Sequence, residues 1–185
     1  CFFGYLVGYF PPGKISPLKF FRASAAIMKA HQVAYTAIHE LQPMAKVSVS
    51  HQIIPFYTMH SWSCLEAIIA HMIQFMYKPL LDSIVTGVVK YTILGIPIYY
   101  KRIPGLKDSV DFIAINHYTS IWITINPAQW SKNKGDPPLL GRHPHYQDSN
   151  EGGWTLVPPS LAATMRWVQK KWNPLRLPMT ISEHG

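Results

Sequence analysis

A single carboxylate lies near the end of this chain, where a buried strand is expected to finish. Glu183 follows an apolar stretch that begins at Leu177, and it lies within the sequence Ile-Ser-Glu-His-Gly of residues 181–185. In α/β barrels the chemistry is done at the carboxyl ends of the strands. Glu183 is therefore a candidate nucleophile or general acid. Asn116 and Tyr118 follow another apolar run, and taken alone they would be ordinary polar caps on a strand.

The other residues that could do chemistry form no site pattern. His143 and His145 lie two positions apart in a polar stretch, and no third ligand has the spacing of a metal site. The two cysteines, Cys1 and Cys64, are too few for a disulfide scaffold and give no metal spacing. The residue pattern therefore predicts neither a metal nor a cofactor.

Hydrophobic periodicity and helix breakers divide the chain into alternating helices and strands. Helices are expected where apolar residues recur at helical spacing, and strands where they alternate or form short runs. The expected elements are a loop over 1–17, a helix over 18–41, a strand over 46–56, a buried helix over 63–81, a strand over 110–115, a polar loop over 121–153, a helix over 160–172 with Ser160 as its N-cap, and a strand over 177–182. This alternation predicts βα units, and therefore an α/β fold with parallel strands and outer helices.

The composition indicates a chain with much buried surface. Of its 185 residues, 48% are hydrophobic and 14% are charged, against a usual quarter for charged residues. The formal charge of +8 favours an anionic partner such as a membrane surface. No nucleic-acid-binding signature accompanies the scattered basic residues, so nucleic acid is not an expected partner. The apolar stretch 84–100 is interrupted by Lys90 and is shorter than a spanning helix requires, so we expect it to be buried or to lie at the surface.

Six segments match one known set of motifs, in order and at consistent spacing. They are the Gly- and Pro-containing stretch 4–13, the Ala-His pair 30–31 within a long helix, residues 79–87, the sequence Asp-Phe-Ile-Ala-Ile-Asn-His-Tyr-Thr-Ser of residues 111–120, the stretch 153–161, and residues 181–185. Together they resemble glycoside hydrolase family 1, the β-glucosidase family. The resemblance implies a (β/α)8 TIM barrel, with residues 1–185 as a single partial catalytic barrel domain that runs from after strand four through strand seven.

The resemblance also implies a function, a retaining β-glycosidase that hydrolyses O-glycosidic bonds through a glycosyl-enzyme intermediate without a cofactor or metal. It makes Glu183 the nucleophile, and Asn116 and Tyr118 the residues that bind substrate or support that nucleophile. The acid/base glutamate of the family would lie shortly before Cys1, and the eighth strand after Gly185. We therefore expect the 185 residues alone to be inactive, and their partners to be a glycoside substrate and the remainder of the barrel.

Two departures from the family motifs keep other functions open. His117 and His184 stand where the family has Tyr and Asn, and the chain is unusually basic. One alternative is a catalytically degenerate family member that acts as a binding or structural subunit. Another is a membrane-surface glycosyltransferase that acts on glycolipids. An Asn-Glu-Pro sequence just before Cys1 would favour the enzyme over the degenerate subunit.

Overall fold

The computed structural model describes residues 1, 3–8, 10–74, 78–93, 95–130, 138–141, 145 and 155–184 of the 185. The chain divides into two compact units that alternate along the sequence. Unit 1 comprises Cys1–Val49, Met76–Ala114 and Trp172–Thr180. Unit 2 comprises Ser50–Phe75, Ile115–Lys171 and Ile181–Gly185. The expectation of one domain over residues 1–185 stays a prediction.

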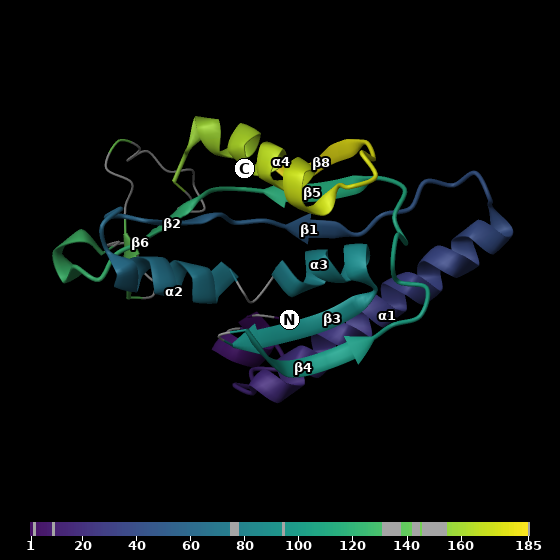
Figure 1. Ribbon diagram of the computed structural model, residues 1–185, viewed down its shortest axis with the longest axis horizontal. Coiled ribbons are helices and arrows are strands. Elements are labelled where there is room, and N and C mark those ends of the chain that lie inside the picture. Colours follow the sequence, from purple (N-terminus) through teal and green to yellow (C-terminus); the bar gives the residue numbers. More distant parts are fainter. Residues whose placement is uncertain are drawn as a thin grey trace. The chain divides into compact units, whose positions relative to one another are not determined.

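Helices and groups of strands follow one another along the chain, and Figure 1 labels most of them. The helices are α1 (Pro17–Leu41), α2 (Cys64–Gln74), α3 (Lys78–Thr86) and α4 (Pro158–Trp172), with a π-helical turn η1 (Phe3–Val7) and a 3-10 turn η2 (Pro127–Gln129). The strands are β1 (Ser50–Gln52), β2 (Phe56–Thr58), β3 (Val88–Ile93), β4 (Ile96–Arg102), β5 (Ile113–His117), β6 (Ile121–Ile123), β7 (Leu140–Gly141) and β8 (Met179–His184). They form three sheets, with orders β1-β5-β8, β2-β6-β7 and β3-β4.

The backbone hydrogen bonds beside β1 and β5 follow a parallel pattern. The amide of Asp111 donates to the carbonyl of Val47 at 2.9 Å, and the amide of Ile53 donates to the carbonyl of Asn116 at 2.9 Å. The residue numbers rise together on the two segments, as they do in a parallel ladder. β2 and β6 are also parallel, with Tyr57 opposite Trp122. The predicted α/β class with parallel strands is confirmed.

Two of the expected elements are divided in the structure. The strand expected over 46–56 is wrong in extent, because the chain forms the short strands β1 and β2 with an irregular stretch at 53–55 between them. Pro55 accounts for part of this break, since a proline has no backbone N–H to donate to a strand ladder. The helix expected over 63–81 is two helices, α2 and α3, and residues 75–77 between them lie outside the described residues. Pro79 is the second residue of α3, in the first turn where proline is tolerated.

The prediction that this helix is largely buried is confirmed at Pro79 and Leu81 of α3 but is wrong for one side of α2. Leu65, Ile68 and Met72 on α2 are 53%, 54% and 59% exposed. They recur at a spacing of three to four residues, so they share one side of the helix. The opposite side packs against the rest of unit 2. It carries the buried residues of α2, Glu66 and Ala70.

Three further boundaries differ from the expectation. α4 begins at Pro158, so Ser160 lies in the first helical turn and is not the N-cap. Proline is favoured at the first helical position because its fixed φ suits a helix start. The last strand, β8, runs two residues later than expected, which places Glu183 inside the strand. Within 121–153, predicted as loop, the described residues include β6 and β7, and within 1–17 they include η1.

Unit 1 is built around the aromatic face of α1. Ser16 caps this helix and Pro17 is its first residue, which explains why it begins where the sequence predicts. The ring of Tyr91 on β3 lies 5.4 Å from that of Phe20 and 4.5 Å from that of Phe21. Phe20 and Tyr91 are both buried, so α1 packs directly against the β3-β4 hairpin, as Figure 1 shows.

In unit 2 the side of α2 that carries Glu66 and Ala70 packs against β2 and β6. The side-chain amide of Gln74 at the end of α2 donates to the carbonyl of Phe56 at 2.9 Å. Ile115, Ile123 and Val168 are fully buried. β5, β6 and α4 thus each contribute a side chain to the apolar core of unit 2.

The described residues of the apolar stretch 84–100 include the last turn of α3, all of β3 and most of β4. Among the described residues, no helix combines the length and the apolar character needed to cross a membrane.

Candidate active site

Tyr118 and Glu183 are in direct contact in unit 2. The phenol of Tyr118, which directly follows β5, donates a hydrogen bond to Oε2 of Glu183 on β8. Glu183 is exposed and Tyr118 is half-buried. The hydrogen bond directs the carboxylate toward the end of β5. An exposed carboxylate held near the end of a strand has the position that a nucleophile needs.

Three polar side chains from three neighbouring strands meet beside this pair. The hydroxyl of Ser182 donates to Oδ1 of Asn116 at 2.7 Å, and the hydroxyl of Ser50 donates to the same oxygen. The two hydroxyl oxygens lie 2.8 Å apart. Both bonds engage the amide oxygen of Asn116, so its nitrogen keeps two donors for other partners. This cluster, which we call the Ser-Asn-Ser cluster (Ser50, Asn116 and Ser182), ties β1, β5 and β8 together next to Glu183.

His184 follows Glu183 and is also anchored to β5. Its Nδ1 lies 3.0 Å from the backbone carbonyl of His117. A carbonyl only accepts hydrogen bonds, so Nδ1 carries the proton of this bond. The contact fixes the orientation of the imidazole at the end of β8.

His117 is buried and lies in a chain of hydrogen bonds. Its Nδ1 donates to the carbonyl of Ile53 at 3.1 Å, and its Nε2 accepts from the hydroxyl of Ser160 at 2.7 Å. The hydroxyls of Ser160 and Ser120 are in turn hydrogen-bonded. Burial lowers the pKa of His117, and the nearby His184 acts in the same direction. The ring is therefore held neutral, as one donor and one acceptor, beneath the strand end that carries Tyr118.

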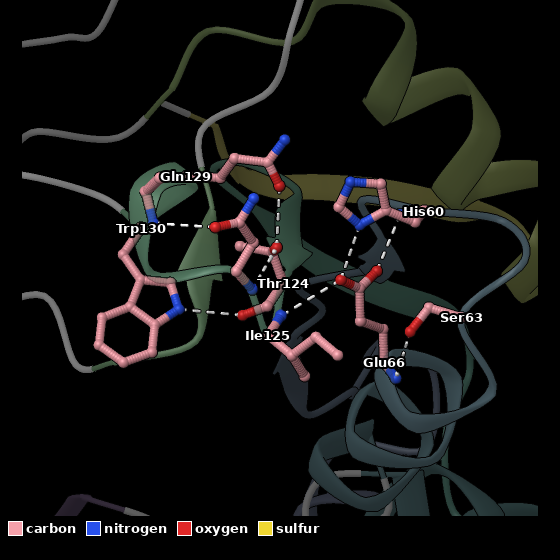
Figure 2. A network of polar contacts seen from close by, with 9 residues as sticks. His60, Ser63, Glu66, Thr124, Ile125, Gln129 and Trp130 are labelled. Carbon is pink, nitrogen blue, oxygen red and sulfur yellow. Dashed lines mark hydrogen bonds and ion pairs between the residues drawn. The ribbon is translucent and has the colours of Figure 1, made fainter.

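A second polar centre of unit 2 is built on Glu66, which has no exposed surface. Figure 2 shows its carboxylate facing His60 and Ile125. Oε2 accepts from the backbone amide of His60 at 2.8 Å, and Oε1 lies 2.9 Å from Nδ1 of His60 and 3.2 Å from the amide of Ile125. Burial alone would raise the pKa of Glu66, but the bonds from His60 and Ile125 more than offset burial and lower it. Glu66 thus links the segment after β2 to the segment after β6.

The segment after β6 carries its own network, also drawn in Figure 2. The indole nitrogen of Trp130 donates to the carbonyl of Thr124 at 3.1 Å, and the hydroxyl of Thr124 donates to the side-chain oxygen of Gln129 at 3.1 Å. These bonds fold the residues around η2 back onto the end of β6.

The structure brings together two of the three predicted site residues by direct contact. Tyr118 bonds to Glu183, whereas the bonds of Asn116 go to Ser50 and Ser182. The roles of all three stay predictions. Among the described residues, no three histidine, cysteine or acidic side chains come together to hold a metal ion. Of the two histidines considered as metal ligands, His143 and His145, the first lies outside the described residues.

Sequence reasoning missed the Glu66 centre and the role of Ser50. A signal for Glu66 was present, because Ser63 and Glu66 have the Ser-x-x-Glu spacing of a helix N-terminus. The amide of Glu66 donates to Oγ of Ser63 at 3.3 Å, as that motif predicts. Its carboxylate, however, turns to His60 and Ile125, which no local pattern indicates.

Comparison with known proteins identifies the family. The family model for glycosyl hydrolase family 1 matches residues 1–185. The chain belongs to this family. The resemblance inferred from the motifs is thereby confirmed, and with it membership of a family of glycoside hydrolases.

Individual relatives agree with this family assignment. The chain is 31% identical to a 6-phospho-beta-glucosidase from Dickeya chrysanthemi over 81 residues, which cover 43% of this chain and 16% of that protein. Its fold is similar to that of a beta-glycosidase from Pyrococcus horikoshii, with a TM-score of 0.74, 24% identity and coverage of 100% of this chain and 39% of the other. A beta-glucosidase from Exiguobacterium marinum gives a TM-score of 0.76 at 18% identity, with 100% and 42% covered.

The chain therefore spans about two fifths of the length of the glycosidases whose fold it shares. Its fold is part of a (β/α)8 barrel, as predicted. The hydrolase class that the motifs implied is that of the family, and β-glucosidases are among its structural neighbours.

Proposed function

We propose that this chain contributes the nucleophile of a retaining β-glycosidase, and that Glu183 is that nucleophile. The observation that carries the proposal is the hydrogen bond from Tyr118 to the exposed carboxylate of Glu183 at the end of β8. Family membership supports it, because the same glutamate lies in the motif that resembles the family's nucleophile segment.

The proposed reaction has two displacement steps. An oxygen of Glu183 attacks the anomeric carbon, the bond from that carbon to the leaving oxygen breaks, and the leaving oxygen takes a proton from a carboxylic acid. Water then attacks the glycosyl-enzyme ester, loses a proton to the same second carboxyl group, and releases the sugar and free Glu183. Retention requires the two carboxyl groups to lie roughly 5 Å apart. The second group would be the family's acid/base glutamate, which the resemblance places before Cys1.

The neighbours of Glu183 have separate roles in this proposal. Tyr118 donates a hydrogen bond to the attacking carboxylate and holds its orientation. Asn116 is oriented through its amide oxygen by Ser50 and Ser182, which leaves its two N–H donors for hydroxyl groups of the sugar. His184 is held on the carbonyl of His117 and stands at the rim beside the nucleophile. The substrate class is therefore a β-glycoside, with the remainder of the barrel supplying the other subsites.

The test is mechanism-based labelling of the full-length protein. A 2-deoxy-2-fluoro β-glucoside traps the glycosyl-enzyme, and peptide mass spectrometry locates the modified residue. We expect label on Glu183 and none in the Glu183→Gln variant. Because one relative is a 6-phospho-beta-glucosidase, the 6-phosphorylated probe is run in parallel. Label on a different carboxylate would refute the assignment.

Other outcomes would select among the alternatives. A folded protein that takes no label with either probe would be a degenerate member that binds or supports a partner. Label on Glu183 with transfer of the sugar to an added lipid alcohol, and little free sugar, would indicate a glycosyltransferase. Residues 1–185 alone are expected to show no turnover, because the proposed mechanism needs a second carboxyl group.

A further inference from the structure

The connection between β5 and β6 consists of residues 118–120 and belongs to neither strand. Ladder bonds flank it on both sides, because the carbonyl of Asn116 accepts from the neighbouring segment and the amide of Ile121 donates to it, each at 2.9 Å. Tyr118, the residue that contacts Glu183, lies within this connection. Its position therefore depends on what holds the residues between the two ladder bonds.

The side chains on either side of Tyr118 are buried and anchored. His117, Thr119 and Ser120 are 1%, 3% and 2% exposed. The hydroxyl of Thr119 donates to the carbonyl of Thr155, shortly before α4, at 2.7 Å. Tyr118, in contrast, is half-buried. The connection is thus fixed through the neighbours of Tyr118.

The hydroxyl of Ser160, in the first turn of α4, engages two of these neighbours at once. Nδ1 of His117 donates to a backbone carbonyl, so Nε2 of the neutral ring accepts, and the hydroxyl of Ser160 donates to it at 2.7 Å. That bond uses the single proton of the Ser160 hydroxyl, so the hydroxyl of Ser120 donates to the oxygen of Ser160. Ser160 is itself buried. One buried hydroxyl therefore links the residue before Tyr118 to the residue two positions after it.

We propose that Ser160 is a positioning residue that holds Tyr118 in place against Glu183. The proposal rests on the proposed function, in which Glu183 is the nucleophile. Ser160 acts through the buried side chains of His117 and Ser120, which lie on either side of Tyr118 along the chain. Without this hydroxyl, two buried polar groups lose a partner, and the connection is no longer fixed on both sides of Tyr118. The phenol then meets the carboxylate less often.

The hydroxyl of Ser160 is not needed to begin α4. Pro158 is the first residue of the helix, a position that suits the fixed φ of proline. The amide of Ser160 donates to the carbonyl of Val157 at 2.9 Å, and this backbone bond does not depend on the side chain. A capping role would place Ser160 before the helix, whereas it lies inside the first turn. The side chain therefore serves the network around Tyr118 rather than the helix start.

The test is a double-mutant cycle in the full-length protein. Ser160→Ala should lower kcat/KM for an aryl β-glucoside by about fivefold, because the phenol of Tyr118 is displaced but not removed. In the Tyr118→Phe background the same change should cost less than about twofold, because the contact that it supports is already gone. A purely structural role would give the same loss in both backgrounds. Ser120→Ala removes the other bond of the Ser160 hydroxyl, and it provides the same comparison if Ser160→Ala does not fold.

A second readout does not need activity. The NMR signal of the phenol carbon of Tyr118 is identified by its absence in Tyr118→Phe. It should shift in Glu183→Gln, which changes the partner of the phenol, and in Ser160→Ala, which changes its position. If the unmodified protein shows neither turnover nor label on Glu183, the proposed function fails, and this signal alone decides whether Ser160 positions Tyr118.

The matched control is Thr164→Val, one turn further along α4. Thr164 is 1% exposed, and among the described residues its hydroxyl has no hydrogen-bond partner, so the change removes a buried hydroxyl outside the network. This variant should keep kcat/KM within about twofold and leave the Tyr118 signal in place. An equal effect of Ser160→Ala in both backgrounds, or an unmoved Tyr118 signal in a folded Ser160→Ala protein, would overturn the proposal.

Discussion

The phenol of Tyr118 donates a hydrogen bond to Oε2 of Glu183, across 65 positions of sequence and between the ends of β5 and β8. This contact links the proposed nucleophile to the neighbouring strand rather than to its own loop. The orientation of the carboxylate is therefore a property of strand pairing.

The first prediction compares the two members of this contact in the full-length protein. Glu183→Gln should reduce kcat for an aryl β-glucoside by several orders of magnitude, because the attacking group is lost. Tyr118→Phe should reduce it much less, by roughly tenfold, because one hydrogen bond is removed while the reacting group stays. Steady-state kinetics of both variants provides the measurement, and a Tyr118→Phe loss as large as that of Glu183→Gln would contradict the separate roles.

The second prediction concerns the buried carboxylate of Glu66. Glu66→Leu keeps the apolar bulk but leaves the His60 and Ile125 donors without their acceptor, so we expect a loss of roughly 3 kcal/mol in the free energy of unfolding. Glu40→Leu, at an exposed glutamate on α1, is the matched control and should stay within about 0.5 kcal/mol. Urea unfolding of both variants tests the difference. Equal stabilities of the two variants would show that the Glu66 bonds contribute nothing net.

The third prediction concerns pH and His117. Because burial lowers the pKa of His117 below its ordinary value of 6.5, the unfolded chain takes up a proton near that pH that the folded chain does not. The free energy of unfolding should therefore decrease as pH falls through about 6.5, and level off below the folded pKa. His117→Gln should make this dependence shallower, although it lowers stability at neutral pH through lost hydrogen bonds.

A part of the dependence should survive in the His117→Gln variant. Burial also lowers the pKa of His31, whose Nε2 lies 2.7 Å from the carbonyl of Ser109 in unit 1. Urea midpoints between pH 8 and pH 5 should therefore be steepest for the unmodified chain and flattest for the double variant His31→Gln with His117→Gln. The same slope in all variants would show that these rings are not held neutral.

The fourth prediction concerns the end of α3. Gly87 has φ of +75° and its amide donates to the carbonyl of Ser83 at 2.7 Å, which is the left-handed ending that favours glycine. A Cβ there would also lie 3.3 Å from Cβ of Lys107. Gly87→Ala should therefore lower stability by about 1–2 kcal/mol. Thermal unfolding measures this, with an unchanged melting temperature as the contradicting result.

The sequence by itself determined those features that depend on neighbours within a few positions. The uninterrupted helical spacing over 18–41, followed by a proline at position 43, predicted α1 correctly to within one residue. Six short motifs in order, among them those around Tyr118 and Glu183, predicted the family, because each motif is recognised from neighbouring residues without knowledge of the fold. Local periodicity did not show that the chain leaves the strand conformation before Pro55, since the effect of a proline depends on which backbone groups need partners.

The tertiary structure decided which distant residues meet. The Ser-Asn-Ser cluster joins positions 50, 116 and 182, and it exists only because β1, β5 and β8 pair in one register. A shift of one residue would turn each of these side chains to the other face of the sheet. The burial of Glu66 likewise depends on His60 and Ile125 arriving from two different strands. Strand register and packing are set by contacts across the chain, and for that reason the composition of any single segment did not reveal them.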